Sequence, residues 1–160
     1  MKVKIKKLHP DAVIPAYAKP GDAGMDLTAV SMTTDAHGNI CYGTGLAFEI
    51  PEGYVGLVFP RSSIYKKGIV LSNSVGVIDS GYRGEVSFKF KTDSDMVAFA
   101  EQGTESATYT RQPCQNRDTY KLGDRIGQII IMPYPHIEFE EIQELSETER
   151  GTQGYGSSGE

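Results

Sequence analysis

Glycine and proline interrupt this chain so often that no long regular element fits between them. The 160 residues include 18 glycines and 8 prolines, spread along most of the sequence. No window of about a dozen residues shows the 3.6-residue apolar period of an amphipathic helix. Short apolar or alternating runs lie between the breaks and predict β-strands at 3–5, 45–50, 54–59, 69–71, 86–90 and 126–132. The sequence therefore predicts an all-β fold, as a sandwich, jelly roll or barrel.

Four regions depart from this pattern. Residues 91–118 are polar, with weak hairpin character at 96–99 and 107–109, and we interpret them as an excursion from the core. Residues 32–39 read as a polar turn, and the charged stretch 138–150 suggests a helix, although its apolar residues alternate ambiguously. Residues 148–160 are too rich in glycine to hold a fixed structure alone, so we expect them to be mobile until something orders them.

Charge and hydropathy exclude several classes of protein. The net charge of −5 and pI of about 5.2 argue against a nucleic-acid-binding surface, although a small phosphorylated ligand remains compatible with them. No run of about 18 apolar residues predicts a membrane span. The first eight residues alternate lysine with apolar residues, unlike a signal peptide, so we expect a cytoplasmic protein, or one in the host cell if the chain is viral. The cysteines and histidines show no zinc-ligand spacing.

Two polar turns carry the residues with the clearest chemistry. The glycine-bounded turn at 76–85 presents Asp79, whose carboxylate can orient a water, and Tyr82, whose ring can form the floor of a pocket. After the strand at 54–59, Arg61 offers a planar fork of donors suited to phosphate, with the hydroxyls of Ser62 and Ser63 beside it. Taken alone, each segment also fits an ordinary surface turn.

Three further segments are weaker by themselves. Residues 20–27 form a turn with two acids, Asp22 and Asp26, and residues 123–128 open the last long strand and include Gln128. The C-terminal residues 150–159 mix glycine and serine with Arg150 and Tyr155, and their backbone N–H groups could approach a phosphate closely. Considered alone, each segment is better explained by an ordinary turn or a disordered terminus.

The five segments together, in this order, resemble the five motifs of the homotrimeric dUTP diphosphatases, or dUTPases. They are 23–27, 60–63, 76–84, 123–128 and 150–159. The resemblance implies a homotrimer of distorted jelly rolls with three shared active sites, which hydrolyse dUTP to dUMP and pyrophosphate with Mg²⁺. It also implies a β domain at 1–147, with an insert at about 91–118, and a flexible arm at 148–160 that closes a neighbouring site. In such enzymes the third motif comes from one neighbour and the arm from another.

The resemblance also implies a role for each residue. Asp79 orients and deprotonates the water that attacks the α-phosphorus, and Asp26 contacts waters of the Mg²⁺ ion rather than the ion itself. Four polar residues hold the phosphate chain: Arg61, Ser62, Ser63 and Gln128. The hairpin at 73–79 pairs its backbone with the uracil edge through Asn73, Gly76, Val77 and Ile78. Tyr82 lies under the deoxyribose, Tyr155 stacks on uracil, and four arm residues close on the phosphates: Arg150, Gly156, Ser157 and Ser158.

The chain departs from the family pattern at a few places. Tyr155 replaces the more usual phenylalanine, Gln153 a usual glycine, and Gly127 a usual alanine. The stretch between Tyr82 and Gln128 is longer than in the compact bacterial form, and some viral and phage members have an insert there that can contact other proteins.

Three alternatives remain open from the sequence. A dCTP deaminase has the same fold and a similar arginine–serine segment, but Tyr82 and the complete arm favour the diphosphatase. A regulatory module could bind a protein partner through the insert at 91–118, alone or alongside catalysis. A purely structural jelly roll would have no use for Asp79.

Overall fold

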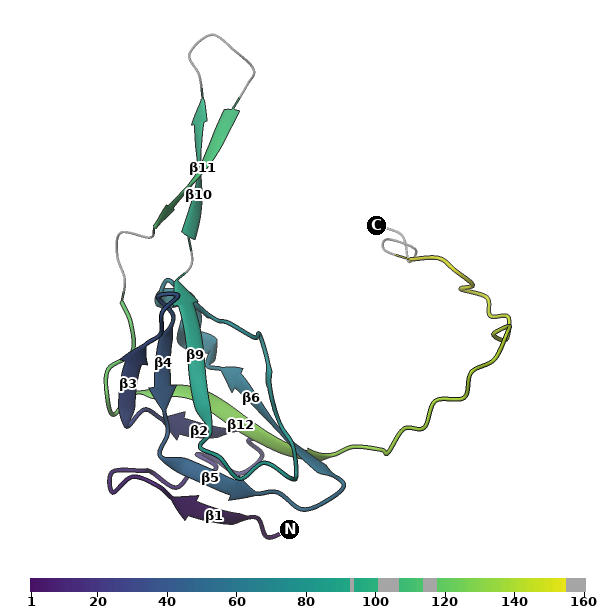
Figure 1. Cartoon of the computed structure of the whole chain (residues 1–160), viewed down its shortest axis with the longest axis horizontal. Helices are drawn as coiled ribbons and strands as arrows, with labels where there is room; N and C mark the ends of the chain where they lie inside the picture. Colours follow the sequence, from purple (N-terminus) through teal and green to yellow (C-terminus); the bar gives the residue numbers. More distant parts are fainter. Residues whose placement is uncertain (93, 101–106, 114–117, 155–160) are drawn as a thin grey trace.

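The computed structural model describes residues 1–92, 94–100, 107–113 and 118–154, and these form an antiparallel β protein (Figure 1). One four-stranded sheet has the order β2–β12–β6–β8, from Met25–Thr28, Arg125–Pro133, Tyr54–Pro60 and Gly76–Ile78. The other has the order β3–β4–β9–β7, from Ser31–Thr34, Ile40–Gly43, Ser87–Thr92 and Ile69–Leu71. Except for β3 and β4, neighbours in the two sheets are not consecutive in the chain, as in a jelly roll, and the all-β prediction is confirmed.

Two smaller sheets complete the described chain. β1 (Lys4–Lys7) pairs with β5 (Leu46–Glu49), and β10 (Ser94–Ala100) pairs with β11 (Ala107–Pro113). The second pair confirms the hairpin predicted from residues 96–99 and 107–109. The one helical element among the described residues is a short 3₁₀ helix, η1 (Ser62–Lys66). None of the helical structure described is long and apolar enough to cross a membrane.

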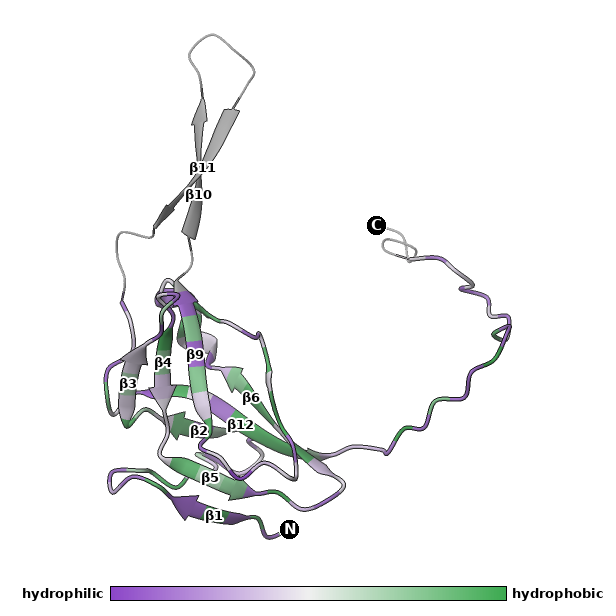
Figure 2. Ribbon diagram, in the orientation of Figure 1, coloured by the Kyte–Doolittle hydropathy of each residue, from purple (hydrophilic) through white to green (hydrophobic). Residues whose placement is uncertain are grey.

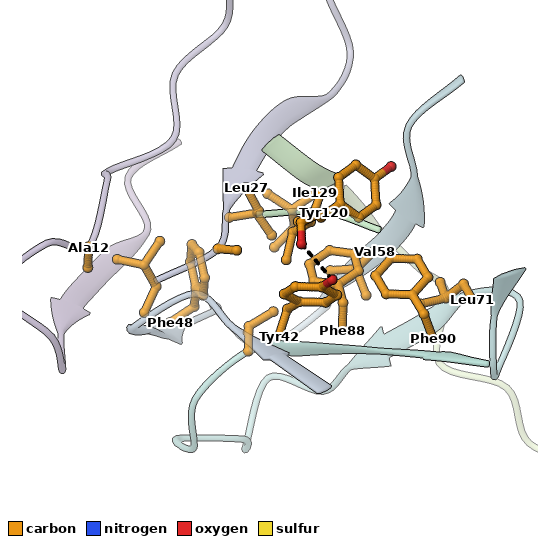
Figure 3. Close-up of a cluster of buried hydrophobic side chains, with 14 of the residues drawn as sticks. Ala12, Leu27, Tyr42, Phe48, Val58, Leu71, Phe88, Phe90, Tyr120 and Ile129 are labelled. Carbon is orange, nitrogen blue, oxygen red and sulfur yellow. Dashed lines mark hydrogen bonds between the residues drawn. The ribbon is translucent and has the colours of Figure 1, made fainter. Parts of the chain in front are cut away.

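The core lies between the two large sheets. Leu27, Val58 and Ile129 come from the first sheet and are almost fully buried. Tyr42, Phe88 and Phe90 face them from the second sheet, as Figure 3 shows. Alternation places these apolar side chains inward and leaves the lysines of β1 and β9 outward, which gives the mixed colouring of the strands in Figure 2. The predicted strands 54–59, 69–71, 86–90 and 126–132 correspond closely to β6, β7, β9 and β12.

Three sequence predictions need correction. Residues 25–27 of the turn predicted at 20–27 lie in β2, and residues 32–34 of the turn predicted at 32–39 lie in β3. The turn itself is confined to Asp35–Asn39, where the Asn39 side chain and the backbone N–H groups of His37 and Asn39 donate to the Asp35 carboxylate and hold its pKa well below its usual value. The polar residues of β2 and β3 are held in strands by pairing with a neighbouring strand: β2 pairs with β12, and β3 pairs with β4.

The charged stretch 138–150 is extended and contains no helix. Ile137, just before this stretch, and Phe139 within it are two residues apart, which suits an extended chain rather than one face of a helix. Residues 134–154 leave the sheets and run away from them (Figure 1). Phe139 is 97% exposed and Leu145 86%.

Position 127 requires a glycine because the Phe88 ring, across the core, occupies the space of a side chain there. A Cβ placed there would lie 2.1 Å from Cε1 of Phe88 and 2.8 Å from the carbonyl oxygen of Phe59. Phe88 is 1% exposed and stacks on Phe90, so its ring has no space into which to move. The ring thus fills the volume that an alanine methyl at position 127 would need.

We therefore expect Gly127→Ala to destabilise the fold by about 1–3 kcal/mol, because it overpacks a filled core. Thermal or urea unfolding measures the change. Gly81→Ala is a matched control, since a Cβ at Gly81 meets no atom within 4 Å and should leave the unfolding midpoint unchanged. Equal stability of Gly127→Ala and the wild-type chain would contradict this account of the glycine.

Candidate functional site

Asp26 holds two arginines at the adjoining ends of three strands. Its Oδ1 accepts from Nε of Arg61 at 2.9 Å and its Oδ2 from Nη1 of Arg125 at 3.0 Å. The strand register produces this arrangement, because β2 and β6 flank β12 and Arg61 directly follows β6. Asp26 and Arg61 are 28% and 29% exposed, so solvent and ligands can still reach both side chains. Two cations around one carboxylate leave an excess positive charge that suits an anion.

Gln128 lies beside this cluster on β12. It pairs with Asp26 on one side and Phe59 on the other, and its Nε2 donates to the carbonyl of Pro60 at 3.3 Å. Gly24 makes room for it, since a Cβ at Gly24 would lie 2.4 Å from Oε1 of Gln128. The structure therefore brings Asp26, Arg61 and Gln128 together, as the sequence predicts.

Ser62 and Ser63 form the first residues of η1, directly after Arg61. The backbone N–H of Ile64 donates to the carbonyl of Arg61 at 3.0 Å, which keeps the turn tight. Ser62 is exposed and Ser63 half-buried. We call the segment Arg61–Ser63 the Arg61 turn; with Asp26 and Gln128 it forms one half of the candidate site.

The second half is the turn that follows β8. The backbone N–H of Tyr82 donates to the carbonyl of Asp79 at 3.0 Å, and the Tyr82 hydroxyl donates to the carbonyl of Glu85 at 3.0 Å. The Tyr82 ring is 44% exposed and helps line a hollow of about 150 Å³ with Val77, Ile78 and Asp79. Asp79 is exposed, and no described residue bonds its carboxylate. A carboxylate in this position can act on a water.

The loop between β7 and β8 has an unusual backbone. The hairpin predicted at 73–79 is not formed, because β7 pairs with β9 in one sheet and β8 with β6 in the other. Ser74 adopts a left-handed conformation with φ of 60°, and the N–H of Val75 donates to the carbonyl of Asn73 at 2.6 Å. A non-glycine residue with positive φ is uncommon and costs free energy, so the surrounding structure must hold it in place. Asn73 and Val75 are exposed in this loop and Val77 on β8, while Gly76 is buried against Val58.

The two halves lie at opposite ends of β6. Ile78 pairs with Gly56 near the start of β6, so Asp79 follows opposite the beginning of that strand. Arg61 follows its other end, at Pro60. Six residues of extended strand separate these points by roughly 20 Å. The structure therefore does not bring Asp79 and Tyr82 to Arg61 and Gln128 within one chain.

Of the predicted arm at 148–160, the structure describes residues 148–154. Arg150 is exposed and donates from Nε to the carbonyl of Gln153 at 3.3 Å, a local contact within the turn at 148–153. The other predicted arm residues, Tyr155, Gly156, Ser157 and Ser158, lie outside the described residues.

Sequence reasoning gave no role to Arg125 or Tyr120. Arg125 lies in the motif-like segment 123–128, three residues before Gln128, and this position was the only hint in the sequence that it belongs to the site. Tyr120 had no such signal, since only the fold shows that its side chain is buried. Burial raises the pKa of Tyr120, and the charges of Lys67 and Arg61 oppose that rise.

No group of three or more histidine, cysteine, aspartate or glutamate side chains among the described residues could hold a metal ion. A divalent metal at this site would need oxygen ligands from a bound nucleotide or from water as well as any from the protein. Asp26 fits a supporting role there, because each carboxylate oxygen keeps lone pairs beyond the one that accepts from an arginine.

Comparison with known proteins identifies the family. A family model described as dUTPase matches residues 11–105 and 114–159. The chain belongs to the dUTPase family.

Individual dUTPases resemble the whole chain. A deoxyuridine 5'-triphosphate nucleotidohydrolase from Nautilia profundicola is 40% identical over 161 residues, covering 99% of each protein. One from Rhodococcus erythropolis is 37% identical, covering 99% of this chain and 87% of the relative. The solved dUTPase of Staphylococcus bacteriophage 80alpha, with dUPNHPP, has a TM-score of 0.73 and 28% identity, covering 99% of this chain and 98% of that one. The S. aureus phage phi11 dUTPase, at 23% identity and TM-score 0.67, shares the fold.

Proposed function

We propose that this dUTPase hydrolyses dUTP to dUMP and pyrophosphate in a site that subunits of a homotrimer share. The assignment of the reaction rests on family membership, which extends over nearly the whole chain. The placement of the two half-sites at opposite ends of β6 supports the sharing, because one chain cannot bring Asp79 near Arg61. The family assignment does not favour a dCTP deaminase or a purely structural jelly roll.

In this proposal the reaction begins with a water held by the Asp79 carboxylate. The water gives its proton to Asp79 as its oxygen bonds to the α-phosphorus, and the bond to the pyrophosphate oxygen breaks. Because an exposed carboxylate is a weak base, catalysis also depends on stabilising the negative charge that grows on the phosphate oxygens. Arg61, Ser62, Ser63 and Gln128 hold the phosphate chain and take up this charge.

Uracil and deoxyribose would be selected by the Asp79 half of the site. Backbone groups at Asn73, Gly76, Val77 and Ile78 pair with the uracil edge and mismatch the amino group of cytosine, since an unpaired buried polar group discriminates strongly. Tyr82 lies under the sugar and leaves no space for a ribose 2′-hydroxyl. The loop around Ser74, whose left-handed conformation the surrounding structure must hold, supports this selectivity.

Mg²⁺ is the proposed cofactor, because the negatively charged oxygens of a triphosphate are the ligands that Mg²⁺ prefers. A bound Mg²⁺ would neutralise phosphate charge while keeping several of its own waters. Asp26 would hold those waters and keep Arg61 oriented at the same time. A phage phi11 dUTPase structure describes the coordination of a structural Mg(II) ion, and that chain shares this fold.

A division of the chain follows from the same proposal. Residues 1–147 form the β domain, and residues 148–160 form an arm that closes over a site on another subunit. The segment just before this arm carries the exposed apolar side chains Ile137, Phe139 and Leu145. These side chains support contact of the segment with another subunit, because Phe139 would otherwise face water. A cytoplasmic location remains a prediction.

Mixed trimers test the shared site. Asp79→Asn and Arg61→Ala chains should each form inactive trimers. After denaturation and joint refolding in equal amounts, about a quarter of the sites should contain one intact half from each variant. We therefore expect pyrophosphate release at about a quarter of the wild-type rate.

Refolded single variants are the control, and size-exclusion chromatography verifies that the mixture is trimeric. Sites made within one chain would gain nothing from mixing, so activity no greater than that of the single variants would contradict subunit sharing.

A second candidate function is binding of a protein partner through the insert at about 91–118. β10 and β11 support it, because among the described residues they pair with each other and with neither large sheet. A pull-down that compares the full chain with a variant lacking 94–113 tests this role, and an equal set of captured proteins would argue against it.

A further inference from the structure

Tyr82, the proposed floor of the deoxyribose site, is held in place by its own turn. Its hydroxyl donates to the carbonyl of Glu85 at 3.0 Å. The ring lies against Gly84, because a Cβ at that glycine would be 2.6 Å from Cζ of Tyr82. The position of the ring therefore depends on where the backbone of Glu85 is fixed.

The Glu85 side chain fixes that backbone to a different part of the fold. Its Oε1 accepts from the backbone N–H of Gly45 at 2.7 Å, and the two residues are 40 positions apart in the chain. Gly45 is buried and has a left-handed backbone with φ of 65°, so its N–H needs a partner within the fold. Leaving a buried N–H unpaired costs free energy, and this cost favours the bond to Glu85.

The residues around this bond make space for it and hold the end of the turn. A Cβ at Gly43, the last residue of β4, would lie 2.6 Å from Oε1 of Glu85. The carbonyl of Val86 accepts from Oγ1 of Thr44 at 2.6 Å, and its N–H donates to the carbonyl of Leu46 at 2.8 Å. The end of the turn is thus anchored by the Glu85 side chain and by the backbone of the next residue.

Glu85 also belongs to the hollow that Tyr82 helps to form. Both residues line the cavity of about 150 Å³ beside Asp79. The proposed reaction uses Asp79 as the base and gives Glu85 no part in the chemistry. Because Oε1 of Glu85 is already bonded to Gly45, its carboxylate links the hollow to the rest of the fold.

We propose that Glu85 is a positioning residue for Tyr82 and, through it, a determinant of the preference for deoxyribose over ribose. The carboxylate ties the end of the turn to Gly45, the Glu85 carbonyl holds the Tyr82 hydroxyl, and the ring stays where it leaves no space for a 2′-hydroxyl. A displacement of about 1 Å is enough to disturb such a fit. This inference rests on the proposed function, in which Tyr82 lies under the deoxyribose.

Glu85→Ala removes the carboxylate and keeps the backbone carbonyl. We expect the ratio of kcat/KM for dUTP to that for UTP to fall about three- to tenfold, the effect of losing one hydrogen bond. Glu85→Gln keeps an oxygen that can accept from the Gly45 N–H, so its ratio should stay within about twofold of the wild-type value. Pyrophosphate release at high enzyme concentration measures both substrates. An equal loss in the two variants would overturn the inference.

Tyr82→Phe tests the other end of the link. It keeps the ring and removes the hydroxyl that donates to the Glu85 carbonyl. Because Tyr82 is 44% exposed, this variant should fold even if Glu85→Ala does not. We expect a loss of selectivity similar to that of Glu85→Ala, and the double variant should lose no more than either single one, since both changes break the same connection. Additive losses would show independent effects and would contradict the proposal.

Thr44→Val is the matched control for stability. It removes a buried side-chain bond to the Val86 carbonyl, next to the Glu85 contact, and keeps the branched shape of the side chain. We expect a lower melting temperature and a dUTP-to-UTP ratio within about twofold of the wild-type value. Equal losses of selectivity in Thr44→Val and Glu85→Ala would assign the effect to a general loosening of the fold and would also overturn the inference.

Tyr82→Ala separates this inference from the proposed function. It removes the whole ring, so we expect it to lower the dUTP-to-UTP ratio more than Glu85→Ala does. A loss of selectivity in Tyr82→Ala, with the wild-type ratio in both Glu85→Ala and Tyr82→Phe, would overturn the inference alone. A wild-type ratio in Tyr82→Ala would remove the sugar-floor role of Tyr82 and the inference with it, while dUTP hydrolysis by the wild-type chain would stand on its own measurement.

Discussion

Asp79→Asn is expected to lower kcat for dUTP by about 10²–10⁴-fold, the usual contribution of a general base. Asparagine keeps the size of aspartate but cannot accept the proton of the attacking water. The Asp79 carboxylate is exposed beside the hollow above Tyr82, and no described residue bonds it, so the substitution removes no contact of the fold. Pyrophosphate release measures the loss.

Nucleotide binding by Asp79→Asn should be retained. A nonhydrolysable dUTP analogue titrated into the variant tests this, because in the proposed site the phosphate contacts come from Arg61, Ser62, Ser63 and Gln128. Asp11→Asn makes the same chemical change at an aspartate that is 82% exposed and lies outside both half-sites, and it should leave kcat unchanged. Retention of more than about a tenth of wild-type turnover would remove Asp79 from its role as the base.

The strands that alternate strongly could be predicted, and the polar ones could not. β9 alternates buried Phe88 and Phe90 with exposed lysines, and β6 and β12 contain nearly continuous apolar runs, so their sequences identify them as strands. β3 is exposed at all four positions and is a strand because it pairs with β4. That pairing is a property of the sheet, and no local pattern in Ser31–Thr34 contains it.

The site divides in the same way. The motif resemblance named Asp26, Arg61 and Gln128, but it did not show that Arg125 shares the Asp26 carboxylate. That contact depends on the register of β12 against β2, which joins residues about a hundred positions apart in the sequence. The burial of Tyr120 likewise depends on packing against Phe90 and Lys67, which are far from it in the chain. Local sequence identifies reactive residue types, and tertiary contacts decide which of them act together.

Truncation of the chain after Glu149 is expected to leave a folded trimer and to lower kcat/KM for dUTP about 10- to 100-fold. The loss corresponds to the stacking of one aromatic ring on a base, which Tyr155 would provide, together with the phosphate contacts of Arg150 and the glycine–serine residues. The described residues 150–154 make only local turn contacts, such as that of Arg150 with the Gln153 carbonyl, so the fold loses nothing that holds the sheets together.

Two substitutions separate the contributions within the arm. Tyr155→Phe keeps the aromatic face and should retain nearly full activity, whereas Tyr155→Ala should lose about five- to fiftyfold in kcat/KM, most of the stacking contribution. Equal melting temperatures for the full and truncated chains would confirm that the change acts on the site rather than on stability. Unchanged kinetics after truncation would refute the role of the arm, and an equal loss in Tyr155→Phe and Tyr155→Ala would assign the effect to the tyrosine hydroxyl instead of the ring.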